Sequence, residues 1–579
     1  MLSDIKLYVK HTEHPSADPV GPALSPALSS SRRQFLIRSA ALGITGALGA
    51  AATATASAQT AGSGGGIVGS SGPAPRPGTG DDNAPTVAED RKVVIVGSGF
   101  GGGVSALRLT EAGVPVTVLE RGRRWETGPN ADTFPSATAP DKRFLWHRSA
   151  PQLFGRYFPV DPYVGILEAV ATPTMTALCP TGLGGGSLVY QGMSLEPTKD
   201  LFDAHFPEEL DWDRMHRVHY LRVAEMLQLE TCPDDIIASD NYKVARVFAQ
   251  RCRDAGLTPE KIPMPIDWDF ARRELRGEMK PSYTDGSGAM GVNNGSKHSV
   301  DVTYIAAAEA TGLAEIRTCT EVTDIERLKD GRWRVYADHT DDAGVPLQHQ
   351  VITTDRVIMG AGSVNTTRLL LRAKNTGTIP DLPDALGEGW GTNGDRIYVW
   401  SDPGAGFGPV QGGPVVYGTM LWDDVNHAHT VIQASMPGMG TDIASTMMVG
   451  YGVSDTRGRF VWDKGEGQAV LQWPEGGDGE LITGYVRPTA DRIITAGGAH
   501  GMLTDTNTMV NSTWHSLGGA CMGPVCDLEG RVSGQPGLYV LDGALIPGTT
   551  AACNPSMTIA AVAERAMESL VPEIVSSVA

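Results

Sequence analysis

Short apolar runs and glycine-rich turns alternate along the chain in a pattern typical of a buried parallel sheet. The run Val93–Val96 consists of β-branched residues and leads directly into glycines, and apolar residues at helical spacing follow over 104–109. A second apolar run covers 116–119 and ends at Glu120. Short uninterrupted apolar runs are typical of strands that are covered on both faces. The segment therefore predicts a strand, a helix and a second strand.

The same pattern returns much later in the chain. Residues 357–362, VIMGAG, and 538–543, LYVLDG, are again apolar strands that run into a glycine turn, and a further strand is predicted from Thr320 to Ile325. Residues 446–451 and 468–473 alternate or run apolar, which indicates an additional sheet. Because strands of the first kind return only after a long intervening segment, we expect that segment to form a second domain. We therefore predict a two-domain α/β protein.

The glycines after the first strand have the spacing of a dinucleotide-binding turn. In the segment GSGFGG that starts at Gly97, this first glycine permits the tight turn, Gly99 lets a pyrophosphate approach the backbone, and Gly102 lets the helix pack on the strand. The helix N-terminus then faces the phosphates. Glu120 ends the next strand, where a carboxylate can accept hydrogen bonds from ribose hydroxyls. This motif does not separate FAD from NAD, but the late return of the fold, which a simple NAD dehydrogenase does not need, favours FAD.

The N-terminal residues 1–58 have the features of an export signal. A twin-arginine pattern, SRRQFL, starts at Ser31, a mildly apolar stretch follows, and Ala56–Ala58 form a small-residue cleavage signal. An internal arginine and many small residues make the stretch too weakly hydrophobic to span a membrane stably. Twin-arginine export carries folded proteins, so it suits a chain that takes up a cofactor before export. We expect a secreted protein in which residues 59–88, rich in Gly, Ser, Pro and Thr, form a flexible linker.

Charge and cysteine usage limit the partners. The 66 acidic and 47 basic residues give a net charge of −19, and such a surface repels nucleic acid and anionic lipid. We therefore expect a small, neutral or apolar substrate, no nucleic acid and at most peripheral membrane contact. The seven cysteines form no CxxC pair and no histidine stands at zinc-site spacing, so no metal site is predicted. Cys521 and Cys526 could pair in an exported protein, and the oligomeric state is left open.

Further motifs follow one another in a fixed order between residues 184 and 564. They begin with GGGSLV at 184–189, GVNNGSK at 291–297 and GEGWGTNG at 387–394. The C-terminal segment 511–564 then contains WHSLGG, GRV, LYV, DG, IPG and NP. In this order the motifs resemble those of the glucose–methanol–choline (GMC) flavoproteins, and most of all those of bacterial cholesterol oxidases with non-covalent FAD. The resemblance covers roughly residues 90–575.

The resemblance implies the GMC oxidoreductase fold, in which a Rossmann-type FAD-binding domain is joined to an α+β substrate domain roofed by a β-sheet. The FAD-binding domain is expected at 89–125, 298–388 and 531–577, and the substrate-binding domain at 126–297 and 389–530, with the substrate entering between them. Val322 is implied to flank the adenine through its backbone, and Asp542 to lie near the pyrophosphate or the ribityl chain. The full set of implied FAD contacts is Gly97, Gly99, Gly102, Glu120, Gly192, Met193, Val322, Gly362, Asp542 and Gly543.

The predicted chemistry is the oxidation of an alcohol, which needs a hydride acceptor and a base for the hydroxyl proton. Flavin N5 takes the hydride, and a histidine is suited to accept the proton near neutral pH. The resemblance places His515 beside the flavin. It also implies that Asn554, held in extended backbone by Pro555, binds the substrate oxygen or contacts the flavin. We predict that His515 and Asn554 catalyse oxidation of a secondary, sterol-like alcohol to a ketone, with O₂ as the acceptor.

Several positions depart from the cholesterol oxidases. The glutamate that moves the steroid double bond falls on Ile432, or on Gln433 if the register slips by one, and neither side chain can shuttle a proton. Tyr190 and Gln191 replace an Asn-Gly pair whose asparagine touches the flavin, and Ser556 replaces a phenylalanine. We therefore predict no efficient isomerisation of a Δ5-ketosteroid, and cholesterol itself need not be the substrate.

Three other functions share part of this evidence. A GMC dehydrogenase would oxidise another bulky or cyclic alcohol and pass the electrons to a carrier other than oxygen. A flavin-binding protein without catalysis would keep the cofactor motifs, although the intact pair of His515 and Asn554 argues against it. An NAD-dependent dehydrogenase is excluded if the purified protein shows flavin absorbance.

Overall fold

The computed structural model describes residues 84–153, 156–158, 161–507 and 510–578. The predicted export signal and most of the predicted linker lie outside the described residues. Within the described part, none of the helices combines the length and the apolar character that a membrane-spanning helix requires. All seven cysteines are described and are free thiols, so the structure contains no disulfide between Cys521 and Cys526.

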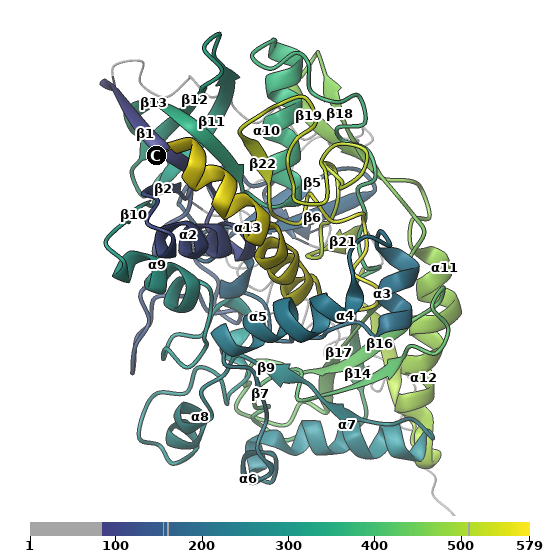
Figure 1. Cartoon of the computed structure of the whole chain (residues 1–579). Helices are drawn as coiled ribbons and strands as arrows, with labels where there is room; N and C mark the ends of the chain where they lie inside the picture. Colours follow the sequence, from purple (N-terminus) through teal and green to yellow (C-terminus); the bar gives the residue numbers. More distant parts are fainter. Residues whose placement is uncertain (1–83, 154–155, 159–160, 508–509, 579) are drawn as a thin grey trace, which may run out of the picture.

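A seven-stranded sheet forms the core of one half of the molecule (Figure 1). Its order is β10–β2–β1–β13–β12–β11, and β22 pairs with the C-terminal end of β13. The strands β10, β2, β1, β13 and β22 run parallel, whereas β12 and β11 are antiparallel. Three distant parts of the chain thus build one sheet. The bounds are β1 Thr86–Val96, β2 Val116–Leu119, β10 Ala314–Arg317, β11 Thr320–Arg327, β12 Trp333–Thr340, β13 Pro346–Met359 and β22 Leu538–Val540.

Strand β1 is longer than the apolar pattern predicts. Its second half, Val93–Val96, is buried as expected. Its first half, from Thr86 to Asp90, pairs with His349–Thr353 of β13, but its side chains are mostly exposed. Backbone hydrogen bonds hold this half in the sheet without apolar burial, so the hydrophobic pattern could not reveal it. The described fold therefore begins inside the predicted linker.

Helices cover this sheet and are joined by a buried ion cluster. Helix α2 (Phe100–Glu111) packs against α13 (Pro555–Val578), η6 (Asp301–Ile305) and α9 (Ala306–Ala310), and α10 (Ser363–Thr376) packs on β11. The Glu564 carboxylate of α13 is fully buried and accepts hydrogen bonds from Arg108 of α2 at 2.7 and 2.8 Å and from Tyr304 Oη at 3.0 Å. A buried carboxylate with charged and polar donors on two helices fixes the C-terminal helix to the nucleotide-binding half.

A six-stranded antiparallel sheet forms the second half, in the order β20–β14–β17–β16–β15–β8. Strand β17 (Ser445–Gly452) agrees with the predicted strand at 446–451. The strand predicted at 468–473 was expected in the same roof, and this is wrong. It is β19 (Gln468–Gln472), which pairs only with β18 (Arg459–Asp463) in a hairpin that packs on α10. The other strands are β8 Glu260–Lys261, β14 Arg396–Ser401, β15 Tyr417–Leu421, β16 His429–Ala434 and β20 Met502–Asp505.

Smaller elements complete both halves. The helices α7 (Lys243–Asp254) and α12 (Arg487–Thr495) pack on each other beside the second sheet. The strands β21, β6 and β5 form a separate three-stranded sheet. The remaining bounds are β3 Gln152–Leu153, β4 Arg156–Tyr157, β5 Leu167–Ala171, β6 Met175–Pro180, β7 Glu230–Thr231, β9 Pro263–Met264, β21 Asn511–Thr513, η2 Gly185–Leu188, α3 Lys199–His205, α4 Trp212–Arg214, η3 Met215–Tyr220, α5 Leu221–Met226, α6 Asp234–Ile237, η4 Asp240–Tyr242, α8 Trp268–Leu275, η5 Ser287–Met290, α11 Gly479–Leu481, η7 Ile482–Val486 and η8 Ala496–Gly498.

Candidate active site

A cavity of about 2020 Å³ extends from the glycine turn after β1 to the second sheet. Its walls include Gly97 and Gly99 at one end and Ile432 and Val449, from β16 and β17, at the other. Ordinary ligand pockets have volumes of about 300–1,000 Å³. The cavity therefore has room for an extended dinucleotide and a bulky substrate together.

The glycine turn is closely packed on one side and open on the other. Gly97 has φ +92°, and a Cβ there would collide with the carbonyl of Gly360. A Cβ on Gly102 would collide with the carbonyl of Gly97, so this glycine is required by helix–strand packing. Gly99 differs, because a Cβ there would meet no atom closer than 3.9 Å, although the residue lines the cavity. Protein packing does not require a glycine at this position, and the close approach of a dinucleotide phosphate to the bare backbone accounts for it.

Glu120 lies at the end of β2 as predicted and is already bound to the chain. Its Oε2 accepts hydrogen bonds from Ser98 Oγ at 2.6 Å and from the Ser98 amide at 3.2 Å. Its Oε1 accepts from the amides of Gly122 at 2.8 Å and Gly182 at 3.2 Å. The carboxylate therefore holds the glycine turn in place as well as lining the cavity. Sequence reasoning missed Ser98, whose hydroxyl is the closest partner of Glu120.

Asp542 performs a similar task at the end of β22. Its carboxylate accepts hydrogen bonds from the Gly362 amide at 2.8 Å, from Thr366 Oγ1 at 2.5 Å and from the Ala544 amide at 2.8 Å. Burial raises the pKa of Asp542 to about 6, and these donors oppose that rise. Asp542 therefore connects the end of β22 to the start of α10. Gly362, Asp542 and Gly543 all line the cavity.

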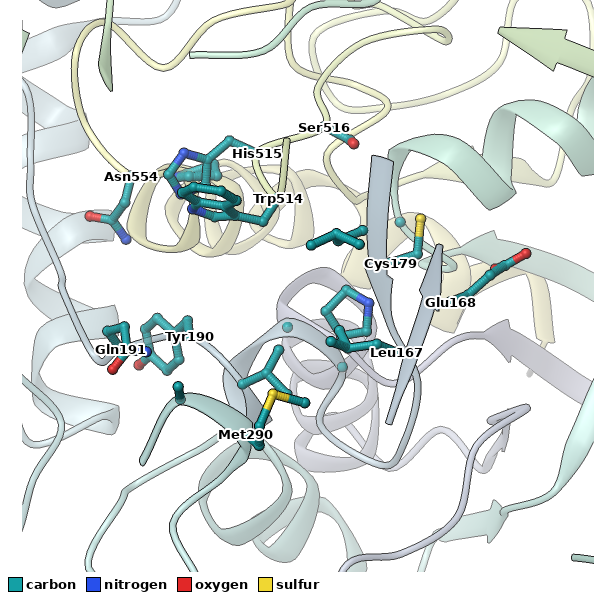
Figure 2. A pocket seen from close by; sticks show the side chains of 18 of the residues that line it. Leu167, Glu168, Cys179, Tyr190, Gln191, Met290, Trp514, His515, Ser516 and Asn554 are labelled. Atoms are coloured by element: carbon teal, nitrogen blue, oxygen red, sulfur yellow. The ribbon is translucent and has the colours of Figure 1, made fainter. Parts of the chain in front are cut away.

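His515 is placed by β21, which pairs with β6 and ends two residues before it. The residue is 7 % exposed and lines the cavity. Its Nδ1 is buried and lies 2.6 Å from Oδ1 of Asp395, whereas no described residue forms a hydrogen bond with its Nε2. The ring of Tyr451 stands edge-on to the imidazole, with 5.5 Å between the centroids. Figure 2 shows His515 beside Trp514 and Asn554, on the other side of the pocket from Tyr190, Gln191 and Met290.

Asn554 lines the same cavity, but most of its hydrogen-bonding capacity is used inside the chain. Its Oδ1 accepts from the Leu195 amide at 3.0 Å. Its Nδ2 donates to the Met193 carbonyl at 2.6 Å and to Ser556 Oγ at 2.5 Å. Since an amide nitrogen has two protons, only Oδ1 keeps a free lone pair for a ligand. Asn554 therefore fixes the 193–195 segment at the cavity wall.

The roof of the cavity decides between the two positions that were matched to the isomerising glutamate. Ile432 and Ala434 of β16 line the cavity, and the alternation of a strand turns Gln433 to the other face. Gln433 Nε2 donates to Ser435 Oγ at 2.7 Å, and its Oε1 accepts from the Val416 amide. The side chain that faces the cavity is therefore Ile432, which has no ionisable group.

The predicted site residues divide into two groups. Gly102 and Gly192 do not line the cavity. Gly102 supports packing, and Gly192 has φ +86° in the turn before Met193. The residues that the structure brings to the cavity are Gly97, Gly99, Glu120, Met193, Val322, Gly362, Asp542, Gly543, His515 and Asn554. Within the described part of the chain, no group of three or more His, Cys, Asp or Glu residues could hold a metal ion.

A buried charge cluster beside Glu120 was not predicted. Glu168 lies 2.5 Å from Arg121 and 3.2 Å from Arg368, and Arg121 stacks on Trp146 at 4.4 Å. Burial alone would raise the pKa of Glu168, but the two arginines outweigh it and lower the pKa to about 2. All four residues line the cavity. They come from four separate segments, so no local pattern marks them in the sequence.

Two family models described as GMC oxidoreductase match residues 162–375 and 486–563. The chain belongs to the GMC oxidoreductase family. A model described as an NAD(P)-binding Rossmann-like domain matches residues 95–160, which include the glycine turn. This confirms the predicted α/β fold class and the resemblance on which the site was built.

Curated relatives of this GMC protein cover most of its length. It is 27% identical over 562 residues to a cholesterol oxidase of Acinetobacter baumannii, with 83% of this chain and 94% of the relative covered. It is also 27% identical over 559 residues to a cholesterol oxidase of Mycobacterium tuberculosis, with 82% and 90% covered.

Solved structures of two other enzymes show the same fold at low identity. A pyridoxine 4-oxidase from Mesorbium loti has a TM-score of 0.56 at 17% identity, with 83% of this chain and 99% of that one covered. A fungal aryl-alcohol oxidase has a TM-score of 0.57 at 15% identity, with 84% and 99% covered. Membership of the GMC family implies a flavin cofactor and an oxidoreductase of the alcohol type. The bare backbone at Gly99 and the length of the cavity fit such a cofactor.

Proposed function

We propose that this GMC protein is a secreted, FAD-dependent enzyme that oxidises a secondary, sterol-like alcohol to a ketone, with O₂ as the electron acceptor. The observation that carries the proposal is the position of His515, whose Nε2 has no partner among the described residues, in one cavity with the dinucleotide turn. The similarity to cholesterol oxidases supports the substrate class. The twin-arginine pattern supports secretion.

In the proposed reaction, His515 transfers the proton and the residues of the cavity roof exclude water. His515 Nε2 accepts the proton of the substrate hydroxyl, which makes loss of the carbinol hydrogen as hydride possible. FAD, when bound between Gly99 and Asp542, supplies the acceptor of that hydride. The roof residues Ile432 and Val449 exclude water and bind an apolar ring system. Asn554 holds the wall segment that carries Met193.

The proposal is tested by mixing the purified flavoprotein anaerobically with sterols, terpenoid alcohols and sugars, and then admitting air. We expect flavin bleaching with sterol-like alcohols, followed by reoxidation and release of peroxide. Bleaching without reoxidation in air would show the alternative, a GMC dehydrogenase with a different acceptor. A flavin that no alcohol bleaches would indicate binding without catalysis and would contradict the proposal.

The roof also predicts that the reaction stops at the ketone. Given a Δ5-3-ketosteroid, the protein is expected to form the conjugated enone no faster than buffer does, because Ile432 offers no base above the ring. The measurement is the rise of the ultraviolet absorbance of the enone with the protein present and absent. A rate that increases with protein concentration would mean that another group moves the double bond.

A further inference from the structure

Asp395 follows the GEGWGTNG segment and precedes β14, and its carboxylate is buried directly behind His515. Its Oδ2 accepts hydrogen bonds from Thr513 Oγ1 at 2.8 Å, the Trp514 amide at 3.1 Å and the His515 amide at 3.3 Å. One carboxylate oxygen thus holds the whole segment from Thr513 to His515.

The other oxygen, Oδ1, has a different neighbour. It lies 2.6 Å from His515 Nδ1, and neither atom has a hydrogen bond with any other described residue. The Nδ1–H direction is not aligned with Oδ1, although the two atoms are at hydrogen-bonding distance. Buried polar atoms are almost always paired, and a small rotation of the ring joins these two. Because an ionised carboxylate only accepts, Nδ1 must be the donor.

We propose that Asp395 is a positioning residue that holds His515 in the Nδ1–H tautomer. The lone pair of the imidazole is then on Nε2, the ring nitrogen left for the cavity. When Nε2 takes the hydroxyl proton of the alcohol, the ring becomes a cation, and the buried carboxylate stabilises that charge. The tautomer follows from the geometry alone, and its catalytic consequence rests on the proposed function.

Other charged and titratable groups near the pair are few. Arg396 follows Asp395 in the chain, and its guanidinium is engaged with Asn511 and lies near Asp505. Asp478 is buried and accepts from Thr392 Oγ1 at 2.8 Å. Tyr451 contacts the imidazole with its ring, and its hydroxyl donates to Met193 Sδ. None of these groups is placed to hydrogen-bond with Nδ1, so the tautomer depends on Asp395.

The variant Asp395→Asn separates positioning from mere structural support. The asparagine oxygen can still accept from Thr513 and from the two amides, so the segment stays held. Its NH₂ group would face Nδ1, and this favours the Nε2–H tautomer, which has no lone pair toward the cavity. Thr513→Val is the complementary variant, because it removes one donor to Oδ2 and one acceptor of the His515 amide, while Asp395 still accepts from that amide and keeps its contact with Nδ1.

The test is ¹⁵N–¹H correlation spectroscopy of the histidine-labelled flavoprotein, in which the His515 signal is assigned by its loss in His515→Gln. We expect the Nδ1–H tautomer in the wild type and in Thr513→Val, and the Nε2–H tautomer in Asp395→Asn. Flavin reduction by the alcohol should slow about 10²–10⁴-fold in Asp395→Asn with little change in KM, and the pH profile should shift. The surface pair of His427 and Asp424, with 2.8 Å between Nδ1 and Oδ2, provides the control Asp424→Asn, which should change none of these results.

The outcomes separate this inference from the proposed function. An Nε2–H tautomer in the wild type, or an unchanged tautomer in Asp395→Asn, overturns the positioning role even if alcohols are oxidised. The expected tautomers without bleaching by any alcohol would support the positioning role and contradict the proposed function. If Asp395→Asn does not fold, the tautomer of the wild-type protein still decides.

Discussion

Replacing His515 with glutamine is expected to slow flavin reduction by the alcohol about 10²–10⁴-fold, the usual contribution of a positioned acid–base group. Glutamine keeps a similar size, but its amide cannot accept the hydroxyl proton. The flavin should remain bound, because His515 contributes none of the glycine turn or of the contacts around Asp542. The measurement is the anaerobic bleaching rate in a stopped-flow instrument, with flavin content determined on the same sample.

His427→Gln is the matched control for this prediction. His427 also has a carboxylate partner at its Nδ1, but it is half-exposed at the surface and does not line the cavity. Its replacement should leave the bleaching rate unchanged. If His515→Gln bleached at the wild-type rate, another group would have to be the base.

The variant Gly99→Val is expected to fold normally and to bind its flavin more weakly. The backbone at Gly99 has φ −67° and ψ −163°, which any residue adopts, and a Cβ meets no protein atom within 3.9 Å. The added side chain would instead occupy the place that a phosphate needs. Loss of one hydrogen bond to a charged group is worth about 1.5–3 kcal/mol, so flavin affinity should fall roughly 10- to 150-fold.

The matched control is Gly484→Val in η7, where a side chain also meets nothing within 4 Å and where the residue does not line the cavity. It should keep a full complement of flavin. The measurements are flavin absorbance per protein and circular dichroism of both variants. A Gly99→Val protein that binds flavin with the wild-type affinity would mean that the phosphates bind elsewhere.

The sequence predicted those parts of the site that depend on neighbours along the chain. The glycine turn, Glu120 and the end of β22 follow from strand and turn patterns, because each is one short strand with its loop. The resemblance to GMC proteins added His515 and Asn554. Pairings between distant residues left no such signal. Asp395 and His515 are 120 positions apart, and nothing in either local sequence indicates their contact.

Two predictions from the sequence, the start of β1 and the sheet that contains β19, were wrong for the same physical reason. The exposed half of β1 and the partner of β19 are decided by backbone pairing with distant strands, whereas apolar patterns report only burial. The choice between Ile432 and Gln433 needed the observed facing of β16, since the strand alternates and both residues are buried. Patterns along the chain therefore predict which segments are strands, but they do not identify the neighbours of a strand or of a side chain.

The assembly of one sheet from β1, β13 and β22 has a consequence for biosynthesis. During translation, the glycine turn emerges long before the carbonyl of Leu541, against which Gly101 packs, and long before helix α13, which covers α2. Contacts across such sequence separations form slowly, because a long loop must close first. The cofactor cavity is therefore complete only after β22 and helix α13 have been made, and a truncation that removes both would abolish cofactor uptake rather than weaken it.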